Sequence, residues 1–123
     1  MLLVDTSVWS DHLRRHDAEL ARHLEAGQVL THPFVIGELA CGVFPRRTEV
    51  LALLRLLPTA PLLGQTEVLG FIERHALAGR GVGYVDIHLL AAARVSAAAV
   101  WTRDKRMAAV AAELDCLHRR PRP

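Results

Sequence analysis

Four carboxylates occupy positions where an isolated charge would be costly: Asp5, Glu38, Asp86 and Asp104. Asp5 ends the apolar run 1–4, and Glu38 has apolar or small residues on both sides. Asp86 follows a glycine-rich turn and begins a mostly apolar run, and Asp104 comes shortly after another apolar run. Acids in apolar surroundings need a positive partner. Several converging acids indicate a site for a hard cation such as Mg²⁺ or Mn²⁺.

Each of these acids also has an ordinary structural explanation. The chain has 13 acidic residues, so some fall near strand ends by chance. Asp86 and Asp104 could be helix caps, because aspartate favours that position. Glu38 is harder to explain, since we expect it in mid-helix beside Ile36 and Leu39, where a lone glutamate would be desolvated.

The elements that must position these acids follow from an alternation of short apolar runs and longer helical patterns. We expect short strands at 2–4, 29–31, 61–63, 99–102 and 116–117. We expect helices at 8–14, 17–26, 33 through at least 38, 46–57, 66–77, 86–95 and 105–114. Thr6 or Ser7, then Asp17 and Thr66, are the expected helix caps, and Gly27 is the expected helix stop.

Strands that alternate with helices predict a parallel sheet covered on both faces. Sites in such sheets form outside the carboxyl ends of the strands. Asp5 and Asp104 each follow an expected strand, and Asp86 opens an expected helix. We therefore expect these acids to share one edge of the sheet.

Size and composition fit one domain with its own core, since the chain has 123 residues and is 51% hydrophobic. We expect a single domain over 1–118 and a basic, disordered tail over 119–123. No apolar run approaches the roughly 20 residues of a membrane span, and nothing resembles a signal peptide, which predicts a cytoplasmic protein with no membrane partner. Cys41 and Cys116 are expected to be small buried hydrophobes.

The formal net charge is only +2, but the basic residues are clustered. Solvated helix ends explain any one cluster, whereas the clusters together with an acidic metal site would suit a polyanionic substrate. Trp9 and Trp101 lie in apolar runs, which favours core packing. The seven histidines show no zinc-type spacing with cysteines or acids. We interpret most of them, including His88, as surface, structural or interface residues.

Four segments of the chain resemble a known family when they are taken in order: DTSVW at 5–9, GEL at 37–39, VDIHLLA at 85–91 and WTRDKR at 101–106. They resemble the PIN domain, and more closely the VapC-type toxins of bacterial toxin–antitoxin pairs. The resemblance extends from residue 2 to about residue 117. It implies a three-layer α/β/α sandwich with a central, mainly parallel sheet of four to five short strands.

The resemblance implies a metal-dependent endoribonuclease toxin that hydrolyses RNA to 5′-phosphate and 3′-hydroxyl ends. Carried over by motif, Asp5 and Asp86 are the main ligands of Mg²⁺ or Mn²⁺. Glu38 and Asp104 complete the acidic site directly or through water. Three hydroxyl residues would orient ligands, water or phosphate, although each is equally explained as a cap or strand end: Thr6, Ser7 and Thr102. The candidates for contacts with RNA phosphates are Arg14, Arg15, Arg80, Arg103 and Lys105.

The resemblance also implies a homodimer that is neutralised by a small antitoxin protein. The leucine-rich helix around 51–57 and the helix near 66–77 are the candidate contact surfaces, and ordinary core packing is the alternative explanation for both.

Three other functions compete with the nuclease interpretation. One is a catalytically silent PIN-like module that binds an antitoxin in an operon-regulating complex, although the four acids are all present. The second is a haloacid-dehalogenase-like phosphatase, which needs a further aspartate at the position of Ser7. The third is a receiver-type phosphoacceptor domain, which needs a strand-end lysine that we do not find.

Overall fold

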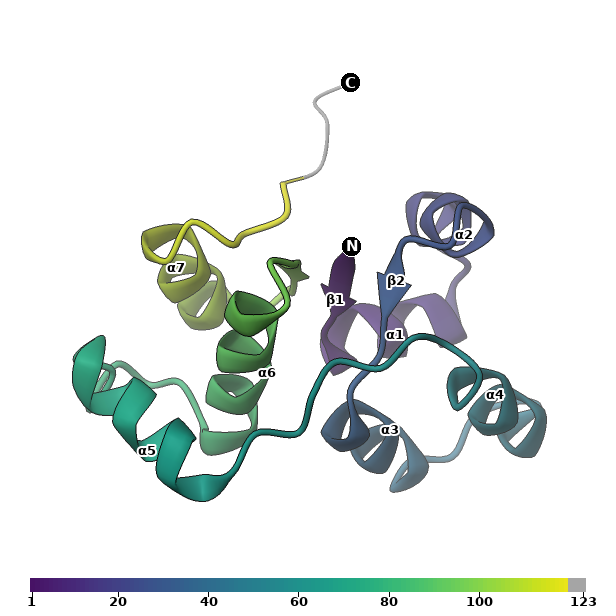
Figure 1. Cartoon of the computed structure of the whole chain (residues 1–123). Helices are drawn as coiled ribbons and strands as arrows, with labels where there is room; N and C mark the ends of the chain where they lie inside the picture. The colour runs from purple at the N-terminus through teal and green to yellow at the C-terminus, as the bar shows by residue number, and fades with distance from the viewer. Residues whose placement is uncertain (120–123) are drawn as a thin grey trace.

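The computed structural model describes residues 1–119, and most of the expected basic tail, residues 120–123, lies outside them. Three parallel strands form the sheet in the order β2-β1-β3: β1 (Leu2–Val4), β2 (Val29–Leu30) and β3 (Ala99–Trp101). The helices are α1 (Thr6–Arg14), α2 (Ala18–Glu25), α3 (Pro33–Ala40), α4 (Arg47–Leu54), α5 (Gln65–Arg74), α6 (Tyr84–Val95) and α7 (Lys105–Glu113). Figure 1 shows α5, α6 and α7 on one side of the strands and α2, α3 and α4 on the other.

The central strand β1 is apolar along its whole length, and Leu3 and Val4 are fully buried. Leu3 pairs with Leu30 of β2 and with Val100 of β3. A parallel strand that is covered on both faces has this continuous hydrophobic sequence rather than an alternating one. The α/β class expected from the sequence is therefore confirmed.

The expected number of four to five strands is wrong for the described residues, because the sheet has three. Residues 61–63 form no strand, and Thr59 contributes only one bridge, to Thr31. Pro58 and Pro61 flank this position, and neither can donate a backbone hydrogen bond to a ladder. At the other edge, Leu117 makes a single parallel bridge to Val100 instead of a strand.

The helix caps differ in part from the expected ones. Asp5 caps α1, so Thr6 and Ser7 belong to the helix instead of capping it. Gly64 precedes α5, and Thr66 lies inside that helix. Asp17 caps α2 as predicted, with its side chain accepting from the backbone N–H of Leu20.

The helix α6 is the most deeply buried helix segment near the site, since all residues from Ile87 to Ala93 are buried. His88 is among them and packs edge-on against Phe34 and Tyr84, which makes it a structural residue. Within residues 1–119, no helix combines the length and apolarity needed to cross a bilayer.

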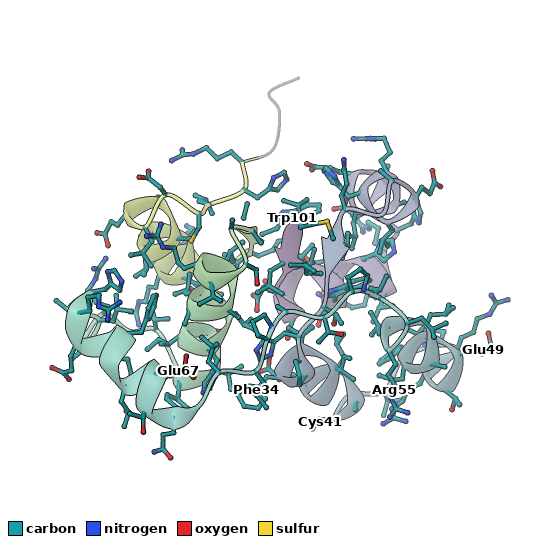
Figure 2. The ribbon with its side chains drawn as sticks, in the orientation of Figure 1. Phe34, Cys41, Glu49, Arg55, Glu67 and Trp101 are labelled. Atoms are coloured by element: carbon teal, nitrogen blue, oxygen red, sulfur yellow. The ribbon has the colours of Figure 1, made fainter. Side chains whose placement is uncertain are left out.

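Two expectations about core residues have different outcomes. Trp9 and Trp101 are buried, with 4% and 3% of their surface exposed, which confirms core packing. Figure 2 shows Trp101 beside the strands and Glu49 on the outer part of α4. Cys116 is buried as expected, whereas Cys41 is exposed because it follows the last turn of α3 at the surface.

The strand order creates a topological switch point at the carboxyl ends of β1 and β3. The chain leaves β1 and reaches β2 on one side, and it later enters β3 on the other side. Ligands of open α/β sheets bind outside the carboxyl ends of the strands at such a point. Asp5 follows β1 and Thr102 follows β3, so both residues lie at the carboxyl ends of these strands, beside the switch point.

Candidate active site

Asp5 is the buried centre of the candidate site. Only 5% of its surface is exposed, and its backbone N–H donates to the carbonyl of Trp101 at 2.9 Å. Its Oδ2 accepts hydrogen bonds from Oγ of Ser7 at 2.7 Å and from Oγ1 of Thr102 at 2.9 Å. The carboxylate is therefore held in one orientation by hydroxyls from two different chain segments.

Asp86 lies in the first turn of α6 and is half-buried. Burial and the negative charges of Asp5, Asp104 and Glu38 raise the pKa of Asp86 to about 6. Burial disfavours the charged form of an acid, and nearby like charges add to that effect. The four predicted acids, which are far apart in the sequence, are therefore close enough to interact electrostatically.

Glu38 lies on α3 and accepts a hydrogen bond from the hydroxyl of Thr6, with Oγ1 and Oε1 2.7 Å apart. Its side chain is exposed, so the expectation that it would be desolvated is wrong. Its apolar neighbours Val35 and Leu39 face the core, while Glu38 lies on another face of the same helix. Its position is explained by this helix face rather than by burial.

Asp104 caps α7, and its Oδ1 accepts from the backbone N–H groups of Arg106 and Met107 at 2.9 and 3.0 Å. Its own backbone N–H donates to Oγ1 of Thr102 at 3.0 Å. Asp104 is therefore a helix cap, which was one of the two roles predicted from the sequence. Its negative charge also acts on Asp86.

The hydroxyls of Ser7 and Thr102 connect these acids. Oγ of Ser7 accepts from the backbone N–H of Arg103 at 3.0 Å and lies 3.5 Å from Oγ1 of Thr102. Each hydroxyl thus links the carboxylate of Asp5 to the segment 102–104. The three predicted hydroxyl residues, Thr6 included, all contact an acid of the site.

The predicted basic residues are not equivalent. The guanidinium of Arg103 contacts Asp11 at 2.6 Å and Asp17 at 3.0 Å. Arg14 also pairs with Asp11, at 2.7 Å, and these two arginines lower the pKa of Asp11. Arg80 pairs with Glu113 at 2.9 Å. Arg15 and Lys105 are exposed.

A surface cavity next to the hydroxyl network is lined by basic and acidic side chains: Asp11, Arg14, Arg15, His16, Asp17 and Arg103. Asp11 and Asp17 are partners of these arginines that were not predicted from the sequence. The spacing of Asp11 and Arg14 is a helical i, i+3 spacing that could have indicated their pair. The pairs to Arg103 join residues 92 and 86 positions apart, which no local pattern reveals.

The donor set of the four acids and three hydroxyls consists of oxygen atoms. Such a set fits hard cations such as Mg²⁺ and Mn²⁺, which prefer carboxylate and water ligands. The raised pKa of Asp86 is the electrostatic sign of uncompensated negative charge that a divalent cation would relieve. In the described residues, no three of these acids bring their oxygens within 4.8 Å of one another, which leaves room for water ligands.

Comparison with known proteins agrees with this fold. The family model for the PIN domain matches residues 2–113, and the chain belongs to that family. It is 48% identical over 114 residues to "Ribonuclease VapC32" of Mycobacterium tuberculosis, in both strain CDC 1551 / Oshkosh and strain ATCC 25618 / H37Rv. Each alignment covers 92% of this chain and 92% of the relative. The resemblance to VapC-type proteins inferred from four short motifs is thereby confirmed.

Proposed function

We propose that the protein is a divalent-metal-dependent endoribonuclease that acts as the toxin of a toxin–antitoxin pair. The observation that carries this proposal is the buried carboxylate of Asp5 at the carboxyl end of β1, held by the hydroxyls of Ser7 and Thr102. Asp86 lies near it, and burial together with the charges of Asp5, Asp104 and Glu38 raises the pKa of Asp86 to about 6. The similarity to proteins named as ribonucleases supports the same conclusion.

Asp5 and Asp86 are the proposed main ligands of Mg²⁺ or Mn²⁺, and Glu38 and Asp104 complete the site directly or through water. When bound, the cation supplies Lewis-acid stabilisation of charge on the scissile phosphate. Ser7 and Thr102 hold the carboxylate of Asp5 in place, and Thr6 does the same for Glu38. Hydrolysis by water would leave a 5′-phosphate and a 3′-hydroxyl.

Basic side chains beside the site would guide RNA. Arg15 and Lys105 are exposed and suit direct contacts with phosphates. Arg14, Arg80 and Arg103 already have carboxylate partners, so contact with RNA would require them to exchange or share these partners. We therefore expect Arg15 and Lys105 to contribute more to RNA affinity than Arg103.

The experiment that tests the activity compares RNA ends in cells after brief expression of the wild type and of Asp5→Ala. We expect discrete new 5′ ends with the wild type alone. The matched control is Asp115→Asn, because Asp115 is exposed, lies outside the site and has a positive φ of 57° that asparagine tolerates. Identical RNA ends for the wild type and Asp5→Ala would contradict the nuclease proposal.

The second candidate function is a catalytically silent module that binds an antitoxin, and the exposed leucines of α4 and the turn after it favour a binding surface there. Leu53 and Leu56 are 64% and 81% exposed, whereas Leu51 and Leu54 of the same region are buried. Leu69 of α5 is 48% exposed. If binding is the sole role, Asp5→Ala and the wild type will behave alike in every assay of RNA, and both will bind the antitoxin.

A further inference from the structure

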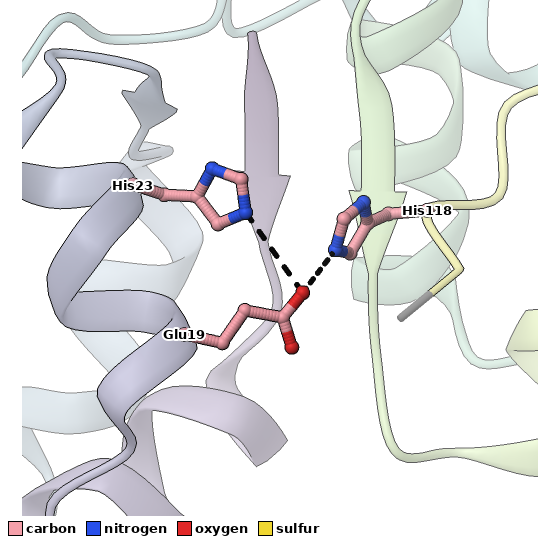
Figure 3. Close-up of side chains that lie close together, drawn as sticks. All are labelled: Glu19, His23 and His118. Atoms are coloured by element: carbon pink, nitrogen blue, oxygen red, sulfur yellow. Dashed lines mark hydrogen bonds and ion pairs between the residues drawn. The ribbon is translucent and has the colours of Figure 1, made fainter. Parts of the chain in front are cut away.

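A second group of metal-ligating side chains lies outside the four acids. Glu19 and His23 come from α2, and His118 comes from the segment that follows the bridge of Leu117 to β3. Each offers one ligand atom, and these three atoms lie within 4.8 Å of one another. Figure 3 shows the two imidazole rings on either side of the Glu19 carboxylate.

The distances within this trio are in part longer than those between the ligand atoms of a metal site. Oε1 of Glu19 lies 3.1 Å from Nε2 of His118 and 3.8 Å from Nε2 of His23. Two donors that each bind a tetrahedral Zn²⁺ at 2.0–2.1 Å lie roughly 3.3 Å apart. The three side chains would therefore need only small adjustments to coordinate the same ion.

The two ring nitrogens of His23 have different neighbours. Its Nδ1 lies 2.8 Å from Oε1 of Gln28. When Nδ1 donates to this amide oxygen, the neutral ring turns the lone pair of Nε2 toward the Glu19 carboxylate. A positive charge between these two acceptors, from a bound cation or from a proton on Nε2, stabilises the arrangement. A ligating histidine whose other ring nitrogen donates to an oxygen is the usual arrangement around zinc.

The surroundings hold these ligands in place. The side chains of Glu19, His23 and His118 are 10%, 26% and 14% exposed. Trp101 contacts both imidazoles edge-on, with ring centroids 6.2 Å from His23 and 5.1 Å from His118. The backbone N–H of His118 donates to the carbonyl of Val100 at 2.8 Å. The site is thus built on α2 and on the edge of the sheet.

We propose that Glu19, His23 and His118 form a zinc site that ties the C-terminal segment to α2 across the sheet. Two imidazoles and one carboxylate suit Zn²⁺, with the fourth position open to water. The site shares no residue with the four acids, and it stands whether or not the protein cleaves RNA. Because zinc would bind the folded chain, it stabilises that state by mass action.

The test is a calorimetric titration of the metal-free chain with zinc sulfate in the Asp5→Asn background, because zinc binds carboxylates more tightly than Mg²⁺ and this substitution removes a main ligand of the acidic site. We expect one zinc per chain and a rise in Tm on binding. His23→Ala and His118→Ala should abolish this binding, and Gln28→Ala should weaken it about 10- to 100-fold. The exposed His16 supplies the matched control, since His16→Ala should bind zinc like the wild type.

Two further measurements keep the proposal testable if a histidine variant fails to fold. Co²⁺ bound to the wild type should give the visible absorption of tetrahedral coordination, and Asp5→Asn should retain it. Crystals soaked in zinc should show an anomalous peak between the three side chains. The absence of stoichiometric zinc binding by the wild type, or binding that survives in both folded histidine variants, would overturn the proposal.

Discussion

The hydroxyl of Thr6 links Glu38 to the segment that carries Asp5. The Oγ1 of Thr6 donates to Oε1 of Glu38 at 2.7 Å. Thr6 directly follows Asp5, the acid at the end of β1. A hydrogen bond to a charged group contributes about 1.5–3 kcal/mol, and less where water can replace it. At the scale of single residues, the site therefore depends on hydroxyls that orient acids as well as on the acids.

Thr6→Val removes this hydroxyl and keeps the shape of the side chain. We expect the rate of RNA cleavage to fall about tenfold, which corresponds to roughly 1.4 kcal/mol, with little change in the unfolding midpoint. Thr6→Ser retains the hydroxyl and should cleave at nearly the wild-type rate. Equal rates for the valine and serine variants, measured by single-turnover kinetics, would show that Thr6 does not position Glu38.

The raised pKa of Asp86 leads to a second prediction, which concerns how the stability of the metal-free protein depends on pH. Its pKa is about 6 in the folded protein and about 3.9 in an unfolded chain, so the folded state binds its proton more tightly. The contribution of Asp86 to the free energy of unfolding is therefore lost as the pH rises from about 4 to 6. Solvent screening limits the effect to on the order of 1 kcal/mol.

Asp86→Asn should consequently raise the stability of the metal-free protein by about that amount at pH 7, and the gain should vanish below pH 4. Urea unfolding in a chelating buffer at both pH values measures it. Asp115→Asn is the control and should show no such gain. A wild type that is as stable as Asp86→Asn at pH 7 would mean that neither burial nor the neighbouring acids disfavour the charged form of Asp86.

At the scale of elements, the loop that leads into α6, the helix that carries Asp86, contains two glycines with unusual backbone conformations. Gly79 and Gly81 both have positive φ values, of 75° and 77°. A Cβ at Gly81 would lie 2.7 Å from Nη1 of Arg106, whereas a Cβ at Gly79 would have nothing within 4 Å. The two glycines therefore share the same backbone requirement and differ in their close neighbours.

This pair allows a matched experiment. Gly79→Ala should lower the free energy of unfolding by about 1 kcal/mol through backbone strain alone. Gly81→Ala should lower it by about the same amount, because the atoms nearest to the new Cβ belong to the end of the exposed Arg106 side chain, which can move. Adding Arg106→Ala to Gly81→Ala should therefore change the cost little. A much larger loss for Gly81→Ala than for Gly79→Ala, removed by Arg106→Ala, would show that Arg106 is held rigidly against this loop.

The sequence predicted those elements whose signals are local. The apolar run of β1, the cap at Asp17 and the positive-φ stop at Gly27 are all set by neighbouring residues, and each was found where it was expected. The segment 61–63 is mostly apolar but begins with Pro61 and follows Pro58 closely, and partner strands rather than its own sequence decide whether it pairs. Its expected strand is therefore absent from the described sheet.

The candidate site was predictable in its residue types but not in all of its contacts. The four acids stand in local motifs, so their positions could be read from the sequence. The exposure of Glu38 depends on which face of α3 packs inward, and the trio of Glu19, His23 and His118 joins residues 99 positions apart. The i, i+4 spacing of Glu19 and His23 was a helical signal of proximity, but His118 had no local signal.

At the scale of the whole molecule, the exposed leucines of α4 and the turn after it predict association. Leu53 and Leu56 are exposed in this chain, and exposed large apolar residues often mark an interface. We expect the purified chain to be a homodimer by light scattering at micromolar concentration. Leu56→Glu should shift the mass toward the monomer, while Glu49→Gln, on the outer part of α4 (Figure 2), should not. A monomeric mass for the wild type at all concentrations would contradict this prediction.

The central claim is that the four acids hold a divalent cation and hydrolyse RNA. The most direct measurement incubates the metal-free wild type, Asp86→Asn and Asp115→Asn with a defined RNA, in a chelator and after addition of Mg²⁺ or Mn²⁺. We predict cleavage by the wild type and Asp115→Asn only when metal is present, with 5′-phosphate ends, and none by Asp86→Asn. Cleavage by the wild type in the chelator, or cleavage by Asp86→Asn at the wild-type rate, would contradict the claim.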